Sequence, residues 1–423
     1  MSPLTPFTAP LHPRYPAAVQ ALYDDPNATF RSPEQAALTH HLFEVKDHVL
    51  AILPTGAGKS LAMMLPSKVE KSGITAVIVP FVALLQDLRR RFTELKIPFC
   101  EWRGKRSVTN VTLRNSRIVL VQVENAATTE FSDWITGQCA HGHLSRIIID
   151  EAHTALIDFG WRKPLDLVAQ VRAAAGVPVV LLTATLAPFS ERALFDRLYL
   201  PDTTHVIRAP STARPNIRYR LTEISDTDIV KTVIHAVRKV ELKDGERGII
   251  FCRTTASAEC FGTRLDIPIY IGPMSEQEKA ASFSEWKRWL SATSAFGFGT
   301  DYPSVRHIIV VECPYDMVSF VQMTGRAGRD GKPAIAEMFY SDPPDFDASK
   351  VDASDDHAGK LAMHRYITKP LPCRRTPISK FCDGSLLTCS AIPNALLCDL
   401  CSKRAVSSAQ KYIKSLHYID SKL

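Results

Sequence analysis

Short apolar runs separated by helical stretches are the feature that most limits how this chain can fold. The runs are 49–54, 76–80, 117–122, 146–150 and 179–185, then 248–253, 267–272 and 307–312. Runs rich in β-branched residues, without polar alternation, are typical of strands buried on both faces of a parallel sheet. Segments 59–71 and 83–95 have helical spacing. This alternation of strands and helices predicts doubly wound α/β layers.

The alternation restarts after Pro210–Pro215, which predicts two α/β lobes. At roughly 100–200 residues per domain, 423 residues accommodate them together with a smaller module. The expected organisation is a Pro-rich, loosely ordered segment 1–29, lobes 30–205 and 206–345, a Cys-rich segment 357–402 and a basic tail 403–423. The tail reads as a solvated amphipathic helix rather than as an arm that binds nucleic acid.

Composition excludes a disordered chain and sets its partners only loosely. Hydrophobic residues are 45% and charged residues 22%, enough apolar material for two cores. No apolar run approaches the roughly 20 residues that a membrane-spanning helix needs, so no membrane partner is expected. The first 29 residues have neither the apolar run of a secretory signal nor the arginines of a mitochondrial presequence. A net charge of +7 permits a polyanionic partner without demonstrating one.

A phosphate-binding loop is the strongest local signal. PTGAGKS at 54–60 follows an apolar run and opens a helical stretch. Its glycines let backbone N–H groups approach phosphate oxygens, while Lys59 would reach the terminal phosphates and Ser60 would hold Mg²⁺. Leu53 stands where the general pattern has Gly, so the loop keeps only a Thr-Gly-x-Gly-Lys core. The alternative is a chance Gly-rich turn between a strand and a helix.

An acidic pair ends a later strand. DEAH at 150–153 follows the run 146–150, and LTAT at 182–185 ends the next run. A phosphate-loop enzyme needs one carboxylate for Mg²⁺ and one to orient the attacking water, roles that Asp150 and Glu151 fit. The alternative is a helix N-terminus that favours acidic residues. The LTAT hydroxyls could sense the state of the nucleotide.

Paired arginines mark the second lobe. In QMTGRAGRDG at 322–331, Arg326 and Arg329 are three apart and are expected on one helix face. They could reach a phosphate and stabilise transition-state charge. A basic helix exit with glycine caps is the alternative.

Five of the ten cysteines lie between Cys373 and Cys401. Without a signal peptide, such a cluster favours metal ligands over disulfides. The four expected zinc ligands are Cys373, Cys389, Cys398 and Cys401. Cys382 is expected to be a buried thiol outside the site. The alternative is a set of reduced core cysteines.

These segments, with AFGFGTDYPSVR at 295–306, resemble in their order a superfamily 2 helicase of the RecQ family. The resemblance covers about residues 30–402, and the Cys-rich segment is similar to a fungal RecQ-like branch. It implies an α/β fold of two RecA-like lobes with doubly wound parallel sheets, plus a small zinc-binding subdomain. It also implies ATP bound between the lobes, with Mg²⁺ and Zn²⁺ as cofactors. The implied activity is ATP-dependent 3′-to-5′ translocation on single-stranded DNA and duplex unwinding.

The resemblance also assigns residues by position. The catalytic set is Lys59, Asp150, Glu151, Gln322, Arg326 and Arg329. The nucleotide-binding set is Arg31, Gln35, Thr55, Gly56, Gly58, Lys59, Ser60 and Asp301, and the Mg²⁺ ligands are Ser60 and Asp150. His153 would link the ATP site to DNA. Phe159, Trp161 and Arg162 resemble the DNA-binding aromatic loop, although Trp-Arg-Lys-Pro replaces Phe-Arg-Pro; packed core aromatics are the alternative.

One departure from the family favours a second hypothesis. Between a helix expected at 275–289 and the segment from Ala295, only five residues remain for a loop and a strand. About eight residues are missing from that count unless the helix frays by a turn. The alternative is a degenerate helicase-like DNA-binding protein, or a DNA-stimulated ATPase without effective unwinding. A phosphate-loop kinase does not explain the paired arginines. The family further implies a monomeric nuclear protein of DNA repair and recombination, with single-stranded and duplex DNA as partners.

Overall fold

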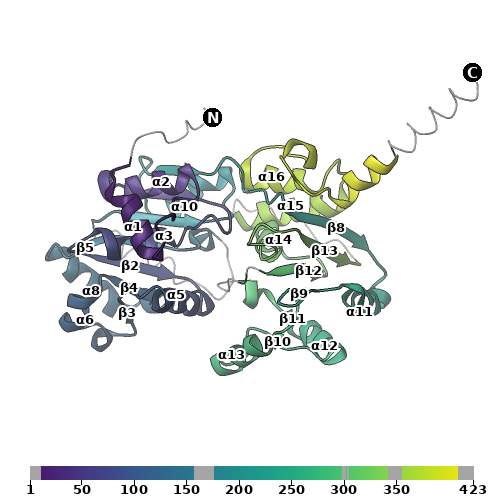
Figure 1. Cartoon of the computed structure of the whole chain (residues 1–423), viewed down its shortest axis with the longest axis horizontal. Helices are drawn as coiled ribbons and strands as arrows, with labels where there is room; N and C mark the ends of the chain where they lie inside the picture. The colour runs from purple at the N-terminus through teal and green to yellow at the C-terminus, as the bar shows by residue number, and fades with distance from the viewer. Residues whose placement is uncertain (1–10, 157–175, 298–301, 303, 342–354, 408–423) are drawn as a thin grey trace, which may run out of the picture. The chain divides into compact units, whose positions relative to one another are not determined.

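The computed structural model describes residues 11–156, 176–297, 302, 304–341 and 355–407. The chain divides into a first unit, Met1–Thr212 with Phe298–Thr300, and a second unit, Ala213–Gly297 with Asp301–Leu423. Each unit has one parallel sheet and its own helices (Figure 1), which confirms the predicted fold class. In the described part of the chain, no helix has both the length and the apolarity to cross a membrane.

The first unit contains a seven-stranded sheet in the order β3-β4-β2-β5-β6-β1-β7. All its strand pairs are parallel. The strands are β1 Val49–Ile52, β2 Ile74–Val79, β3 Phe99–Trp102, β4 Ile118–Gln122, β5 Leu144–Ile149, β6 Val179–Thr183 and β7 His205–Arg208. Every residue of the central strands β1, β2 and β6 is buried, as expected for a sheet covered on both faces.

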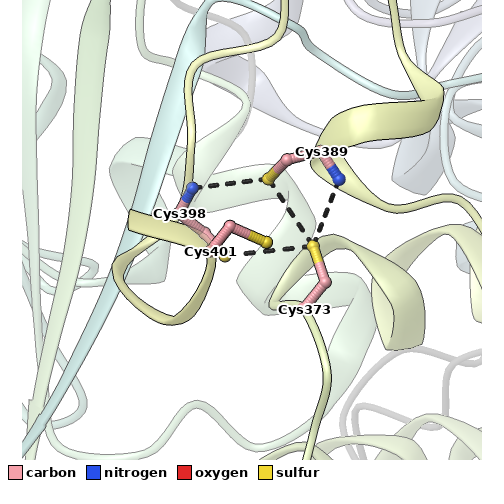
Figure 2. A group of neighbouring side chains, drawn as sticks. All are labelled: Cys373, Cys389, Cys398 and Cys401. Atoms are coloured by element: carbon pink, nitrogen blue, oxygen red, sulfur yellow. Dashed lines mark hydrogen bonds between the residues drawn. The ribbon is translucent and has the colours of Figure 1, made fainter. Parts of the chain in front are cut away.

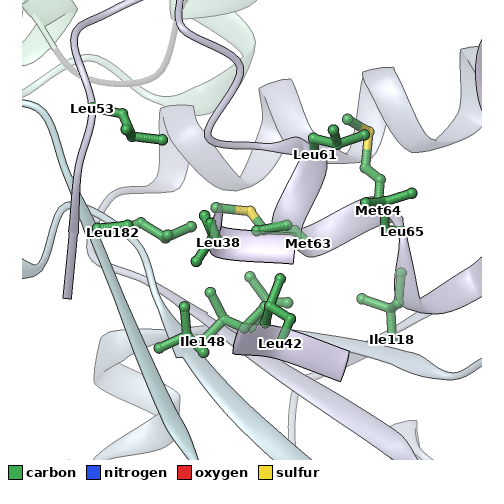
Figure 3. Packing of buried hydrophobic residues seen from close by; sticks show 14 of the residues in the cluster. Leu38, Leu42, Leu53, Leu61, Met63, Met64, Leu65, Ile118, Ile148 and Leu182 are labelled. Carbon is green, nitrogen blue, oxygen red and sulfur yellow. The ribbon is translucent and has the colours of Figure 1, made fainter. Parts of the chain in front are cut away.

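Helices and short helical turns connect these strands. They are α1 Arg14–Tyr23, α2 Pro33–His40, the π-helical turn η1 His41–Val45, α3 Leu61–Met64, α4 Pro66–Val69, α5 Val82–Glu94, η2 Lys105–Ser107, α6 Asn110–Asn115, α7 Val123–Ala126, α8 Thr129–Ala140, η3 Ala152–Ala155, η4 Pro188–Ser190 and α10 Glu191–Arg197. Leu38 and Leu42, from α2 and η1, pack against Ile148 and Leu182 of the sheet (Figure 3). This core fixes the strand ends from which the site is built.

The N-terminal segment is more ordered than its prolines suggest. Helix α1 lies within 1–29, the stretch expected to be loosely ordered, and Tyr15, Val19 and Leu22 are buried in the first-unit core. The ring of Tyr15 stacks on Phe43 at a centroid distance of 5.4 Å. The prediction of loose order was therefore wrong for this helix. Proline is tolerated at helix starts, and apolar residues at helical spacing outweigh its frequency.

The second unit contains a six-stranded parallel sheet in the order β10-β11-β9-β12-β13-β8. The strands are β8 Ile217–Glu223, β9 Arg247–Cys252, β10 Ile269–Tyr270, β11 Trp289–Ala292, β12 Val305–Val311 and β13 Ala334–Tyr340. The helices and turns are η5 Asp226–Asp228, α11 Ile229–Lys239, α12 Thr255–Leu265, α13 Glu276–Glu285, η6 Ser294–Gly297, α14 Met317–Thr324, α15 Asp355–Thr368, α16 Arg375–Asp383 and η8 Cys389–Ala391.

Strand β11 forms in the segment that seemed too short to hold one. Helix α13 ends at Glu285, a turn earlier than expected, and this frees Trp289–Ala292 for a fully buried strand between β9 and β10. The indole Nε1 of Trp286 donates to the Gly248 carbonyl over 3.2 Å. The expected shortage of residues is thus resolved by a short helix and a short strand.

Candidate active site and cysteine cluster

The phosphate loop follows β1 and is held by residues at the start of α2. Arg31 donates from Nη1 to the Gly56 carbonyl over 3.0 Å, and Gln35 donates from Nε2 to the Gly58 carbonyl over 2.9 Å. Gln35 also accepts the Arg31 backbone N–H at 2.7 Å. Ser32 caps α2 by accepting the Gln35 backbone N–H. The structure therefore brings Arg31 and Gln35, two of the predicted nucleotide-binding residues, to the loop.

The loop backbone needs its glycines. Gly56 and Gly58 have φ angles of 87° and 82°, in the left-handed region. A Cβ atom at Gly58 would lie 2.5 Å from Nε2 of Gln35, so the hydrogen bond from Gln35 requires a residue without a side chain at this position. Lys59 donates from Nζ to the Leu53 carbonyl over 3.1 Å. Thr55 lies in the turn of the loop, and Ser60 precedes α3.

The acidic pair lies where β5 ends, at the same edge of the sheet as the phosphate loop. Asp150 is buried, and its carboxylate Oδ1 accepts the backbone N–H of Glu151 over 3.0 Å. Glu151 has a φ of 47°, a strained conformation of the kind that clusters at functional sites. Burial, followed by the nearby Glu151 carboxylate, raises the pKa of Asp150 to about 7, while the charge of Lys59 opposes that rise.

These groups fit a divalent cation. Two carboxyl groups lie together with Lys59 as the nearby cation, and burial makes their negative charge costly. The buried Oε2 atom of Glu151 accepts no hydrogen bond within the described residues. Hard oxygen donors such as the Asp150 carboxylate and the Ser60 hydroxyl are those that Mg²⁺ prefers. The residues present therefore suit the metal that the phosphate loop implies.

His153 connects the acidic pair to the end of β6. Its Nδ1 lies 2.8 Å from the hydroxyl of Thr183 and 3.3 Å from Oε2 of Glu151. The Thr183 hydroxyl also accepts the backbone N–H of Thr185 over 3.2 Å. Burial lowers the pKa of His153. The segments predicted as separate motifs thus form one hydrogen-bonded group.

The paired arginines do not share a helix face. Helix α14, which carries Gln322, ends at Thr324, and Arg326 and Arg329 lie in the turns that follow. Gly325, in the right-handed conformation, caps the helix, and Gly328, with a φ of 53°, lies between the two arginines. The expectation of a common helix face was therefore wrong, because α14 ends before Arg326, at a glycine, a residue that weakens helices.

Two residues that the sequence analysis missed hold this arginine turn, residues 325–331. Arg214 donates to the carbonyls of Gly325, Ala327 and Gly328 at 3.2, 2.9 and 2.7 Å. Asn216 donates from Nδ2 to the Gly328 carbonyl over 2.8 Å. Both precede β8, more than a hundred residues earlier in the chain. No local pattern identifies such a distant contact.

Four cysteines converge in the second unit (Figure 2). Their sulfur atoms all lie within 4.8 Å of one another, as predicted for Cys373, Cys389, Cys398 and Cys401. The Cys373 sulfur lies 3.5 Å from that of Cys389 and 3.9 Å from that of Cys398. Zn–S bonds of about 2.3 Å place tetrahedral ligands about 3.8 Å apart, so this set fits zinc. All ten cysteines lie in the described ranges, and none forms a disulfide.

The immediate surroundings also suit thiolate ligands. Backbone N–H groups of Arg375 and Cys389 donate to the Cys373 sulfur at 3.4 and 3.3 Å. The thiol of Cys398 and these amides lower the pKa of Cys373, whereas the same contact with Cys373, followed by burial, raises the pKa of Cys398 to about 12. Cys382 is buried but does not belong to the four-sulfur group, in line with its expected exclusion.

Two arginines hold the cysteine cluster, one within its own segment and one against the start of β8. Arg374 pairs with Asp399 at 3.1 Å. Arg375 is buried and donates to the carbonyls of Arg214 and Ile217 at 2.7 and 2.6 Å, and to those of Pro215 and Leu396. Arg375 therefore fixes the same stretch of chain that holds the arginine turn.

Four predicted site residues lie outside the described residues. They are Asp301 and the three residues of the expected DNA-binding loop, Phe159, Trp161 and Arg162.

Two family models match the chain. Residues 32–193 match the family described as DEAD/DEAH box helicase, and residues 228–331 match the helicase conserved C-terminal domain. The first match covers most of the first-unit sheet, and the second match covers most of the second-unit sheet.

Relatives and solved structures agree with these matches. The chain is 27% identical to mouse ATP-dependent DNA helicase Q5, over 89% of this chain and 42% of the relative. It is 28% identical to the probable ATP-dependent DNA helicase RecS of Bacillus subtilis, over 78% of this chain and 67% of that protein. Dbp5 of Saccharomyces cerevisiae, solved with RNA and ADP BeF3, has the same fold with a TM-score of 0.60. That alignment is 16% identical and covers 84% of this chain and 91% of that chain. The chain thus spans less than half the length of the mouse relative.

Proposed function

We propose that this chain, which belongs to the RecQ family of DNA helicases, hydrolyses ATP and uses the energy to move along single-stranded DNA and separate duplexes. The observation that carries the proposal is the grouping of Lys59 with Asp150 and Glu151 at one edge of the first-unit sheet. Parallel strands bring their carboxyl ends to one edge, where α/β folds bind ligands.

Within the first unit, each residue takes a role that its position supports. Arg31 and Gln35 hold the loop and read the base, and Lys59 neutralises the terminal phosphates. Ser60 and Asp150 would hold Mg²⁺, which would neutralise phosphate charge when bound. Glu151 orients the attacking water and accepts its proton. The amides of the loop from Thr55 to Gly58 cradle the phosphates.

The second unit supplies the remaining charge. Arg326 and Arg329 are proposed to stabilise the transferring phosphoryl group together with Gln322, and Asp301 is proposed to bind the nucleotide. An arginine finger typically accelerates phosphoryl transfer by about 10³–10⁵-fold. The hydrogen bonds from Arg214 and Asn216 to the arginine turn support this proposal, because they restrict where the two guanidinium groups can lie.

DNA is the proposed polymer and 3′ to 5′ the proposed direction of movement. Phe159, Trp161 and Arg162 are proposed to stack on and contact single-stranded DNA. Zn²⁺ held by the cysteine cluster has a structural role. We also propose a monomeric nuclear protein of DNA repair and recombination, testable by light scattering and by imaging a fluorescent fusion.

Phosphate release with and without single-stranded DNA tests the proposal. We expect DNA to stimulate hydrolysis, and Lys59→Ala and Glu151→Gln each to lower it by about 10²-fold or more. Lys71→Ala, which changes an exposed lysine of the same unit, is the matched control and should leave the rate unchanged. A rate indifferent to nucleic acid, or to the loss of Lys59, contradicts the proposal.

Strand displacement then separates unwinding from hydrolysis alone. A labelled duplex with a 3′ overhang should be opened in the presence of ATP, and one with a 5′ overhang should not. The main argument for a degenerate protein was a missing strand, and the buried strand β11 removes that argument. Hydrolysis without displacement on either substrate would restore the alternative.

A further inference from the structure

Three polar side chains converge on the first unit away from the nucleotide loop. His41 begins the π-helical turn η1, Asp47 lies in the connection to β1, and His205 begins β7. One ligand atom from each lies within 4.8 Å of the other two. The Nδ1 atom of His41 is 3.0 Å from Oδ1 of Asp47. The rings of His41 and His205 stack at a centroid distance of 3.9 Å with an interplanar angle of 23°.

The backbone holds the three residues in place. The His205 backbone N–H donates to the His48 carbonyl over 2.8 Å, at the start of the pairing between β1 and β7. The Lys46 backbone N–H closes the π-helical turn onto the His41 carbonyl over 2.8 Å. Single-turn π-helices occur frequently at functional sites. Backbone hydrogen bonds of a sheet edge and of a closed turn therefore fix the positions from which the side chains project.

The exposure of the three side chains increases from His41 through Asp47 to His205. The His41 side chain is 12% exposed and that of Asp47 34%, while His205 is exposed. An ion would thus have a solvent side for entry and for water ligands, and an inner side formed by His41. Two imidazoles and one carboxylate suit borderline divalent ions such as Zn²⁺ better than Mg²⁺ or Ca²⁺.

The cluster is distinct from the sites already described. It lies at the amino ends of β1 and β7, whereas the phosphate loop follows the carboxyl end of β1. The four cysteines belong to the second unit. We propose that His41, Asp47 and His205 bind one Zn²⁺ ion, or another divalent transition metal with the same preference for imidazole and carboxylate. The exposed His205 ring turns out of its stack on His41 when the ion binds, so that the in-plane nitrogen lone pairs of both rings face the metal. Bound metal joins the end of α2 to the edge strand β7.

The full chain tests this proposal by its metal stoichiometry. Protein purified with its cysteine cluster loaded with zinc is dialysed against a weak chelator and titrated with Zn²⁺ in competition with a chromophoric indicator. We expect a second equivalent, bound at least tenfold more weakly in His205→Ala and in Asp47→Asn. Because His205 is exposed, its replacement should leave the fold intact, which circular dichroism checks. His235→Ala, which changes an exposed histidine of the second unit, should keep the second equivalent.

A second probe identifies the ligands. Co²⁺ added to the zinc-loaded protein should give visible absorption without sulfur-to-metal charge-transfer bands, and His205→Ala should abolish it. The main competitor is the stacked pair His141 and His143, with ring centroids 5.8 Å apart. The proposal is overturned if His143→Ala removes the second equivalent, or if wild type and His205→Ala bind the same amount of metal.

Discussion

The phosphate loop and the arginine turn are held in the same way, although they belong to different units. In each, a left-handed glycine offers its carbonyl to a side-chain amide: Gln35 binds Gly58, and Asn216 binds Gly328. In each, a Cβ atom on that glycine would lie 2.5 Å from the amide nitrogen. In each, an arginine also binds a loop carbonyl.

The residues that hold the two loops differ in how they are themselves held in place. Arg31 and Gln35 precede the phosphate loop by about one helix and belong to the same local segment. Arg375 in turn binds the carbonyls of Arg214 and Ile217, on either side of Asn216, and its backbone N–H donates to the sulfur of Cys373 in the cysteine cluster. The first loop is supported locally, whereas the second depends on a chain of contacts that ends at the cysteine cluster. The two loops should therefore respond differently to damage far from them.

Removing zinc from the cysteine cluster should produce the largest difference between the two loops. Structural zinc contributes on the order of 10 kcal/mol of binding free energy in small domains. We expect chelation, or Cys389→Ser, to lower the unfolding temperature of the second unit and to abolish hydrolysis. Binding of a fluorescent ATP analogue to the first unit should persist. Cys260→Ser, on α12 and outside the cluster, is the control. Equal loss of nucleotide binding would refute local support of the first loop.

Arg375→Ala should break the link while leaving the cysteines in place. The change leaves four backbone carbonyls without their charged donor, which we expect to cost about 3–5 kcal/mol in free energy of unfolding. Urea denaturation measures that cost. Arg365→Ala, at an exposed position of α15, should cost less than about 0.5 kcal/mol. Similar losses in free energy of unfolding for the two variants would show that the contacts of Arg375 do not stabilise the second unit.

The acidic pair gives the first unit a pH dependence of its own. Asp150 keeps its proton up to about pH 7 when folded but ionises near 3.8 when unfolded. Without Mg²⁺, its contribution to the free energy of unfolding is therefore present below about pH 4 and lost as the pH rises to about 7. The loss is on the order of a few kcal/mol. Denaturation of wild type and Asp150→Asn across this range measures it. Parallel curves would contradict the raised pKa.

A pair of glycine variants gives the smallest expected effect. Gly328→Ala places a Cβ atom 2.5 Å from Asn216 and 2.6 Å from the Lys332 carbonyl, on a left-handed backbone, and should cost about 2–3 kcal/mol. Gly331→Ala has the same backbone hand but open space around the new atom, and should cost about 1 kcal/mol. Thermal unfolding should rank them in that order, and hydrolysis should fall further in Gly328→Ala.

The sequence predicted the strands that are apolar throughout and missed those that are not. Runs such as 76–80 and 117–122 correspond to β2 and β4, because central parallel strands are buried on both faces. Strand β8, which alternates Arg218 and Arg220 with buried Ile217 and Tyr219, is an edge strand with a mixed pattern. Strand β11 depends on where α13 ends, and a helix boundary is poorly specified by local pattern.

The site divides in the same way. Lys59, Asp150 and the four cysteines were predictable because their spacing in the chain reflects one local geometry. Arg214 and Asn216 were not, because their partners lie more than a hundred residues away. His41 and His205 meet only through the pairing of β1 with β7. Residues marked by a local motif can be predicted from the sequence, whereas contacts between distant segments that carry no motif cannot.

Helix α1 has a practical consequence for anyone who shortens this protein. A fragment designed from the matched helicase region would begin near residue 32 and discard Tyr15, Val19 and Leu22. The apolar surface exposed by this truncation, including Phe43, would then favour self-association. A shortened fragment should therefore begin upstream of Arg14, because α1 covers part of the hydrophobic core of the first unit.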